Sequence, residues 1–576
     1  MVVPVKIYDV ARPISKNGES VWKIGLGISV ALVGGGIVWW YYKRSSSKSK
    51  VITTDSNTQA NGVVVSENGI KEPEVQTPLE RAEQIKRAGN DFFKKGEYLD
   101  ALRCYSEAID LCPASETTIQ ATYYQNRAAC YERLNKIEEV VKDCSKALEL
   151  NPKYVKACSR RAKAYQTLGQ LTGCLEDVTA MCILENFQNQ RTLEMADLIL
   201  KEVGKLNARK AMENKAPVQP SPHFVKNYFA TFPNDPVISA SDFQVVEINH
   251  SESADSTKNL LERAKQLLVR GRYDEVIQTC TEAVTAGEGL EPEALLLRAT
   301  MYLLRGQNNL ALDDLNTIIG QELTPTEHNT NITVNALIKR ASLYLQSNEK
   351  EKTFEDLATA ERLAPNIPDL YLHRGQVNLL TDNVEQSIAD YNTCVSLDPD
   401  FAIGMMQGYY AQYRRAVQQN SSSGIAKVIE KFKRGIRKFP ACSEAYALLA
   451  QVLMDQQQFD EADNYYDSAM RMDPANATIR VHRALLQLQW KGDVDAAIKY
   501  INEGIQVDNK CSFCYETLAT IEVQRGNLRQ AVELFNKALP LAKTEQELAH
   551  IFSLRDSAVA QLVVVDRLGM AGLIGL

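Results

Sequence analysis

Five polar side chains early in the chain have the types and spacing needed to hold an anionic group. They are Lys86, Asn90, Asn126, Lys156 and Arg160. Lysine and arginine supply positive charge, and the asparagine amides supply directional hydrogen bonds. Members of the pairs Lys86/Asn90 and Lys156/Arg160 are four residues apart, which places each pair on one face of a helix. Any one residue alone would be interpreted as a solvated surface group. The set together indicates binding of a carboxylate, such as a peptide's C-terminus, rather than catalysis.

A repeat of 34 residues predicts the elements that position these side chains. Pro365, Pro399, Pro440 and Pro474 each end an apolar segment, with gaps of 34, 41 and 34 residues. The longer gap is one repeat plus seven residues, and the polar segment 420–424 marks that insertion. Counting back from Pro474 assigns repeat positions 4, 7, 8, 20, 24 and 27 to Tyr446, Leu449, Ala450, Ala462, Tyr466 and Ala469.

This pattern resembles the tetratricopeptide repeat, a helix–turn–helix unit of the same length. The template also fits the first repeat, through Gly89 and Tyr105, and the last, through Ala519 and Phe535. The resemblance implies an all-α superhelical solenoid of about 11 repeats in two blocks, with first helices lining the inner wall. In this frame the five polar residues fall at positions 2, 5, 6 and 9 of three consecutive first helices.

Composition excludes several classes of function. The chain has 65 basic and 72 acidic residues and a net charge of −7, which argues against nucleic acid as a partner. Its twelve cysteines are scattered and indicate a reducing compartment. Cys511 and Cys514 form a lone CxxC, and the six histidines have no metal-ligand spacing. No phosphate-binding glycine loop, nucleophile elbow or HExxH motif is present. We therefore expect neither an enzyme nor a metal or other cofactor.

An uncharged segment near the N-terminus predicts a membrane anchor. Ile24–Tyr42 contains nineteen residues without a charge, which is long enough to cross the hydrocarbon core as a helix. Aromatic residues cluster at its end, followed by Lys43 and Arg44. A cleaved signal peptide is the alternative, but no small-residue cleavage site follows the segment. The basic flank favours a cytosolic location for the large domain. The short, moderately apolar span favours the mitochondrial outer membrane.

The predicted domain organisation therefore has seven parts. These are a segment outside the cytosol (1–23), the transmembrane anchor (24–42), a flexible cytosolic linker (43–76), an N-terminal repeat block (77–215), a proline-rich junction (216–255), a C-terminal repeat block with a capping helix (256–567) and a tail (568–576).

The five polar residues resemble the carboxylate clamp of chaperone-binding tetratricopeptide domains. Such domains bind the C-terminal Glu-Glu-Val-Asp of the cytosolic seventy- and ninety-kilodalton heat-shock chaperones. The resemblance implies that Lys86, Asn90, Asn126, Lys156 and Arg160 bind this peptide. Arg161, the next residue, is expected to be a surface charge.

The anchor, linker, clamp block and long second array together resemble the family of large chaperone-docking receptors of the mitochondrial outer-membrane translocase. That resemblance implies reception of hydrophobic precursor proteins, such as inner-membrane carriers, and contact with other translocase subunits. The inward positions of the second block then predict a precursor-binding groove. Its candidate residues are Asp369, Leu372, Met405, Met406, Tyr409, Glu444, Leu448, Val481, His482 and Leu485. Two alternatives remain open: a soluble co-chaperone or scaffold, and a membrane-anchored tetratricopeptide co-chaperone on another organelle such as the endoplasmic reticulum.

Overall fold

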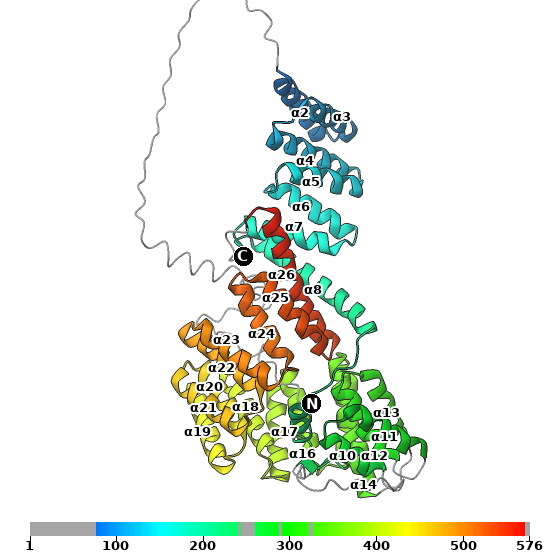
Figure 1. Ribbon diagram of the computed structural model, residues 1–576, viewed down its shortest axis with the longest axis vertical. Coiled ribbons are helices and arrows are strands. Elements are labelled where there is room, and N and C mark those ends of the chain that lie inside the picture. Colours follow the sequence, from blue (N-terminus) through cyan, green and yellow to red (C-terminus); the bar gives the residue numbers. More distant parts are fainter. Residues whose placement is uncertain (1–76, 240–241, 244–259, 287–290, 322–325, 571–576) are drawn as a thin grey trace, which may run out of the picture. The chain divides into compact units, whose positions relative to one another are not determined.

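The computed structural model describes residues 77–239, 242–243, 260–286, 291–321 and 326–570 (Figure 1). This part of the chain is built from α-helices and short 3₁₀ turns, without a β-strand. The predicted anchor at 24–42, the segment 1–23, the linker 43–76 and most of the tail lie outside the described residues. So does much of the junction between 240 and 255.

Eleven helix pairs follow the repeat within the described part, which confirms the predicted all-α repeat fold. The first three pairs are α2 (Pro78–Lys95) with α3 (Tyr98–Leu111), α4 (Thr117–Arg133) with α5 (Ile137–Leu150), and α6 (Val155–Thr167) with α7 (Leu171–Leu184). The next four are α10 (Leu260–Val269) with α11 (Tyr273–Ala286), α12 (Glu291–Leu304) with α13 (Asn308–Gly320), α14 (Glu327–Gln346) with α15 (Lys350–Leu363), and α16 (Pro368–Leu380) with α17 (Val384–Leu397). The last four are α18 (Ala402–Gln418) with α19 (Ser422–Lys438), α20 (Ser443–Asp455) with α21 (Phe459–Met472), α22 (Ala477–Lys491) with α23 (Val494–Val507), and α24 (Ser512–Gln524) with α25 (Leu528–Ala538). Outside the pairs lie α8 (Gln190–Glu213), α9 (Pro222–Phe229), the 3₁₀ turn η5 (Leu539–Leu541) and α26 (Glu545–Arg567).

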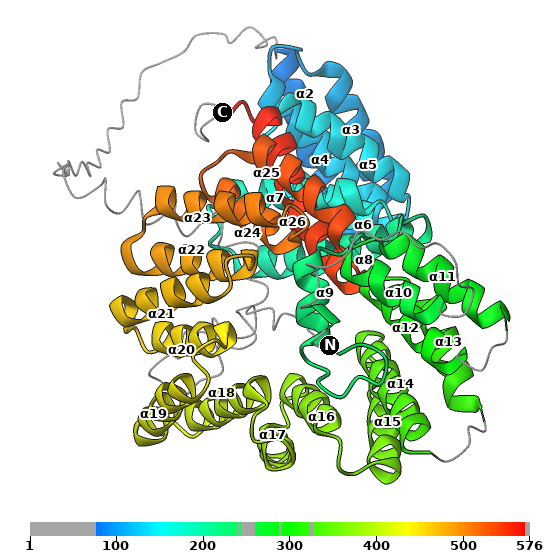
Figure 2. The same ribbon diagram turned by 60° about the horizontal axis from the view of Figure 1, so that its bottom comes forward.

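The contacts divide the chain into two units that do not follow sequence order throughout. The first unit holds the described residues of 77–211, 519–536 and 548–570, and the second holds those of 212–518 and 537–547. The C-terminal helix α26 therefore contributes residues to both units, whereas the sequence-based division assigned it to the second block alone. In the second unit, successive pairs from α10 to α23 follow a curved array (Figure 2). First helices of neighbouring pairs contact one another there, α12 with α14 and α18 with α20, so first helices form the inner wall.

Small residues at repeat position 8 let the two helices of a pair approach closely. A Cβ atom added to Gly89 would lie 3.0 Å from Tyr105, and one added to Gly375 would lie 3.0 Å from Tyr391. In both pairs the tyrosine occupies position 24 and is 1–2% exposed. The side chain missing from one helix is thus replaced by an aromatic ring from the other, which fills the space at native density.

A buried arginine–aspartate pair joins the two helices in five of the repeats. The arginine lies on the first helix and the aspartate sixteen residues later on the second. The pairs are Arg127–Asp143, Arg161–Asp177, Arg298–Asp314, Arg340–Asp356 and Arg374–Asp390, with shortest N–O distances of 2.6–2.9 Å. In each case Nη1 also bonds a side chain on the preceding second helix: Ser106, Ser145, Thr281, Asn316 or Glu361. Each arginine therefore ties three helices together.

The first unit extends beyond its three repeats through α8 and α26. Ala560 of α26 packs into an apolar cluster formed by α6, α7 and α8, and Val564 into one formed by α4, α5, α6 and α7. Asn207 Nδ2 donates to Asp556 Oδ2 at 2.7 Å, and Gly204 allows the close approach, because an added Cβ would lie 2.5 Å from the carbonyl oxygen of Ala549. Among the described residues α26 alone has the length and hydropathy of a membrane span. This packing indicates a core helix of the first unit.

The arginine that contacts three helices should contribute strongly to the stability of its unit. Replacing Arg298 with alanine would leave Asp314, which is 7% exposed, buried without its counter-charge. We expect the free energy of unfolding of the second unit to fall by about 3–5 kcal/mol, measured from the urea midpoint by circular dichroism.

The matched control is Arg103→Ala on α3, where the arginine is 80% exposed and paired with Asp100. That variant should change the free energy of unfolding by less than about 0.5 kcal/mol. An Arg298→Ala loss no larger than the control's would contradict a structural role for the pair.

Candidate clamp and inner wall

The first helix of the array positions Lys86 and Asn90. Its start is fixed by a capping box in which the Thr77 hydroxyl accepts from the Glu80 N–H and the Glu80 carboxylate accepts from the Thr77 N–H. Lys86 Nζ donates to Glu83 Oε1 at 2.5 Å. Burial alone would raise the pKa of Glu83, but the bonds from Lys86 and from the Tyr123 hydroxyl lower it overall. Lys86 is therefore paired with an acid on its own helix.

The two asparagines differ in what they have left to bind a ligand. Asn90 Oδ1 accepts the Tyr105 hydroxyl at 2.7 Å, which leaves its amide N–H groups as the donors. Asn126 lies half-buried on α4, and its side chain forms no hydrogen bond with another described residue. Both amides thus retain donors suited to a carboxylate oxygen.

The third repeat supplies the remaining two cations from α6. Arg160 Nε donates to Glu132 Oε2 at 2.8 Å, and its Nη1 donates to the Gln125 carbonyl oxygen at 3.2 Å. The Arg160 side chain is 20% exposed, and its Nη2 donates to no other described residue. Lys156 is exposed and forms no ion pair with a described acid. The set therefore combines two paired cations, one solvated cation and two amides on α2, α4 and α6.

The expectation that Arg161 is a surface charge is wrong. Its side chain is 12% exposed and forms two bonds of 2.7 Å with Asp177, which is fully buried. Hydrogen bonding to Asp177 raises the pKa of Arg161 against the opposing effect of burial. The sequence signal for this role is the aspartate sixteen residues after an arginine, recurring in five repeats, and the sequence analysis missed it.

The junction after α8 packs on the inner wall of the second unit. Residues 231–238, with α9 before them, contact the first helices α14 and α16 (Figure 2). Lys339 Nζ bonds Asp235 Oδ2 at 2.9 Å with both side chains 1% exposed, and the Phe232 ring stacks on His373 at 4.2 Å. Burial lowers the pKa of Lys339 and that of His373.

Asp369, the first groove candidate, is part of this contact. Its carboxylate accepts from the backbone N–H and from Nδ2 of Asn234, at 3.1 and 3.0 Å. Burial raises the pKa of Asp369 to about 7 in spite of these bonds. The inner wall near α16 is thus covered by the chain's own junction.

The other groove candidates divide by exposure. Leu372, Met406 and Val481 are fully buried in the repeat packing, His482 is 9% exposed beside the Phe513 ring, and Tyr409 packs edge-on against Phe432. Burial lowers the pKa of His482 to about 4. The half-buried candidates that remain are Met405, Glu444, Leu448 and Leu485, on α18, α20 and α22.

Polar groups line the same part of the wall. Gln407 Nε2 donates to Glu444 Oε1, which links α18 to α20. The Tyr413 hydroxyl donates to Asp455 Oδ2 at 3.2 Å. Burial raises the pKa of Glu444 to about 7, and that of Asp455 to about 7. The wall therefore combines leucine and methionine side chains with acids whose ionisation is suppressed.

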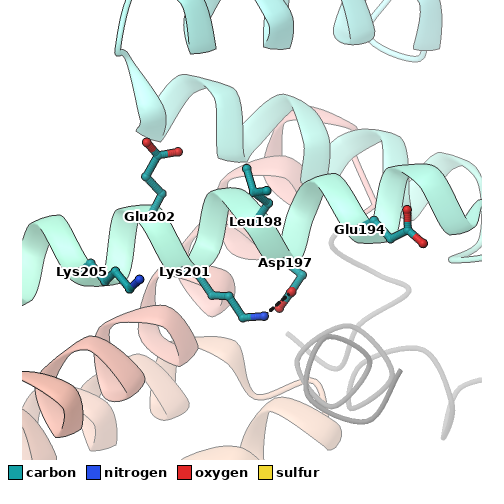
Figure 3. Close-up of a pocket in the computed structure, with 6 residues that line it drawn as sticks. All are labelled: Glu194, Asp197, Leu198, Lys201, Glu202 and Lys205. Carbon is teal, nitrogen blue, oxygen red and sulfur yellow. Dashed lines mark hydrogen bonds and ion pairs between the residues drawn. The ribbon is translucent and has the colours of Figure 1, made fainter. Parts of the chain in front are cut away.

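Two other features show no sign of a separate site. A surface hollow on α8 is lined by one helix alone, with Lys201 and Asp197 paired at 2.6 Å, which is an ordinary solvated helix face (Figure 3). Cys511 and Cys514 are free thiols at the start of α24. The hydrogen bond from Cys514 lowers the pKa of Cys511. Within the described residues no group of three His, Cys, Asp or Glu side chains could hold a metal.

Comparison with known proteins identifies the repeat and its relatives. Family models of the tetratricopeptide repeat match residues 121–154, 368–401 and 447–508. The chain is 45% identical over 497 residues to the human mitochondrial import receptor subunit TOM70, covering 85% of this chain and 81% of the human protein. It is 25% identical over 517 residues to the Saccharomyces cerevisiae protein of that name, covering 83% of this chain and 79% of the yeast protein. The crystal structure of yeast Tom70 aligns with a TM-score of 0.47 and 21% identity, over 86% of this chain and 99% of that one.

The raised pKa of Glu444 predicts a pH dependence. The folded state binds this proton more tightly than the unfolded chain, whose carboxyl has its ordinary pKa of 4.5. Protonated Glu444 therefore stabilises the folded state. This contribution is fully present below pH 4.5 and is lost as pH rises through about 7. Glu444→Gln keeps an oxygen for Gln407 and removes the titration. The free energy of unfolding of Glu444→Gln, relative to that of wild type, should therefore rise by about 2 kcal/mol as pH increases from roughly 5 to 8. Urea unfolding measures this difference.

An exposed carboxylate on a second helix provides the comparison. Glu355→Gln on α15, where the side chain is exposed, is the control for exchanging a glutamate for a glutamine. A Glu444→Gln profile parallel to that of wild type would show that Glu444 is ionised and solvated in the folded protein.

Proposed function

The chain belongs to the family of the mitochondrial import receptor subunit TOM70, and from this membership and the clamp geometry we propose that it docks cytosolic heat-shock chaperones at the mitochondrial outer membrane and receives their precursor proteins. The observation that carries the proposal is the set of donors on three consecutive first helices: Lys86, Asn90, Asn126, Lys156 and Arg160. The ligand is the C-terminal Glu-Glu-Val-Asp of the seventy- and ninety-kilodalton chaperones.

Peptide docking in this clamp is an exchange of carboxylates. Lys86 and Arg160 already bond Glu83 and Glu132, so the entering carboxylates take over or share these donors. Asn126 adds amide donors, and solvated Lys156 adds charge at the rim. Bonds to charged groups contribute more than neutral ones, and the two asparagines fix where the terminal oxygens lie.

Removing the guanidinium tests the clamp. Arg160→Ala should weaken binding of a fluorescent Met-Glu-Glu-Val-Asp peptide to the full chain by about tenfold or more, because a bond to a charged group is lost. The same peptide with a C-terminal amide should bind weakly to wild type. Lys146→Ala on the second helix α5, where the lysine is 58% exposed, is the control and should bind as wild type does. Equal affinities for Arg160→Ala and Lys146→Ala would refute the clamp assignment.

We place the precursor site on the inner wall formed by α18, α20 and α22. The junction covers the wall at α14 and α16. Met405, Leu448 and Leu485 offer half-buried apolar surface beside Glu444. Methionine and leucine side chains adapt to varied apolar segments, which suits precursors that differ in sequence. Other translocase subunits would receive the precursor from this site.

Membrane attachment completes the proposed function. The uncharged segment Ile24–Tyr42 would anchor the chain in the lipid bilayer and leave the bulk of the protein in the cytosol. The alternative is a membrane-anchored co-chaperone on another organelle, such as the endoplasmic reticulum. Imaging a fluorescent fusion of residues 1–60 distinguishes the two membranes.

Site-specific photo-crosslinking tests the precursor wall. A photoreactive residue at Leu448 should crosslink to a chaperone-delivered carrier precursor, because this side chain lies half-buried on the inner wall. The control position is Leu363, at the end of α15 and 48% exposed. Equal crosslinking from the two positions would mean that the precursor does not bind this wall.

A further inference from the structure

The seven-residue insertion in the fifth pair of the second unit lengthens its helices. Helices α18 and α19 have 17 residues each, whereas α16 and α17 have 13 and 14, and α20 and α21 have 13 and 14. The polar segment 420–424 therefore extends the hairpin by about one turn on each side. The insertion is therefore taken up by the two helices, and the loop between α18 and α19 is no longer than that between α16 and α17.

The extended hairpin carries a concentrated positive charge in an acidic protein. Residues 414–438 contain eight cations and a single acid, Glu430, whereas the whole chain has a net charge of −7. Four of the cations are paired with neighbouring helices or turns: Arg414 with Asp382, Arg415 with Glu385, Lys433 with Glu461 and Lys438 with Asp400. Those pairs fix the flanks of the hairpin.

The other four cations form a stripe along α19, namely Lys427, Lys431, Arg434 and Arg437. None of them forms an ion pair with an acid among the described residues. Lys431 Nζ donates to the Gln412 amide oxygen at 2.6 Å, and Arg434 Nε donates to the Glu430 carbonyl oxygen at 3.4 Å, both neutral acceptors. The spacing of four, three and three residues keeps the stripe on one face, which runs for about 15 Å. Val428 and Phe432 occupy the opposite, buried face.

We propose that this α19 stripe binds the anionic phospholipid headgroups of the membrane that carries the protein. The inference rests on the membrane attachment in the proposed function. A row of cations at one level matches a layer of phosphate groups, and each cation near such a surface adds to the attraction. Three of the stripe's cations border only an open hollow lined by α19 itself, together with Ala426 and the single acid Glu430. An acidic peptide would need a groove or apolar pockets for register, and α19 offers neither.

Lysine footprinting of the reconstituted full chain tests the proposal. The chain is placed in vesicles of phosphatidylcholine alone or with about one third phosphatidylserine, and labelled with an amine-acetylating reagent before mass spectrometry. Acetylation of Lys427 and Lys431 should fall by about fivefold or more on anionic vesicles, and high salt should restore it. Lys352 on α15, which is 57% exposed, is the internal control and should react equally on both.

A charge-reversal variant separates the stripe from a general effect of the surface. Arg434→Glu and Arg437→Glu together should reduce the protection of Lys427 and Lys431 on anionic vesicles, with the helical signal and chaperone-peptide affinity unchanged. Equal labelling of Lys427 and Lys431 on the two vesicles overturns the proposal. Protection by soluble polyglutamate but not by anionic vesicles overturns it in favour of an acidic protein partner.

The membrane premise is measured separately. Co-flotation of the chain with neutral vesicles reports the anchor alone. If the chain fails to co-float, the footprint is repeated with the chain added outside the vesicles, and protection there still supports the stripe.

Discussion

The arginine that joins three helices is the interaction on which the arrangement of the binding walls depends. In five repeats it holds a buried aspartate on its own second helix and a polar side chain on the second helix before it. Asn126 and Arg160 directly precede two of these arginines, Arg127 and Arg161. Successive residues on a helix point about 100° apart. Fixing one residue against the second helices therefore fixes its neighbour toward the inner wall.

The repeat frame made the helix pairs predictable, because each pair depends on residues within 34 positions of one another. Gly89 against Tyr105 illustrates this, since position 8 must be small where position 24 is large. The packing of α26 on α8 depends on Gly204 and Ser553, more than three hundred residues apart, and no local pattern marks such a partner. Arg161 was misjudged although its partner Asp177 lies only sixteen residues on, within one repeat length. The recurring arginine–aspartate spacing was not recognised as part of the repeat pattern.

On the inner wall of the second unit, repeat position alone does not predict which side chains are free to bind a ligand. Positions 2, 5, 6 and 9 face inward by repeat geometry, yet Asp369 at position 2 of α16 binds Asn234 of the chain itself. The Lys339–Asp235 pair is buried there, with both side chains 1% exposed. Removing water from both charges is costly, so this contact is maintained only because the ion pair, the Phe232–His373 stack and the apolar packing of α9 act together. Sequence marks the junction residues Phe232, Asn234 and Asp235 only by their proline-rich setting.

The two inner walls differ in the exposure and ionisation of their carboxyl groups. In the first unit Glu83 and Glu132 remain accessible and hold Lys86 and Arg160 in place. Side chains already held in one rotamer lose less conformational entropy when a ligand arrives, so exchange of one carboxylate for another costs less than ordering free lysine and arginine. In the second unit, burial raises the pKa of Glu444 and Asp455, so neither acid presents a full negative charge at neutral pH. Under the proposed function, the first wall would therefore select by charge and terminal geometry. The second, with its acids partly neutral and leucine and methionine beside them, would discriminate by apolar surface.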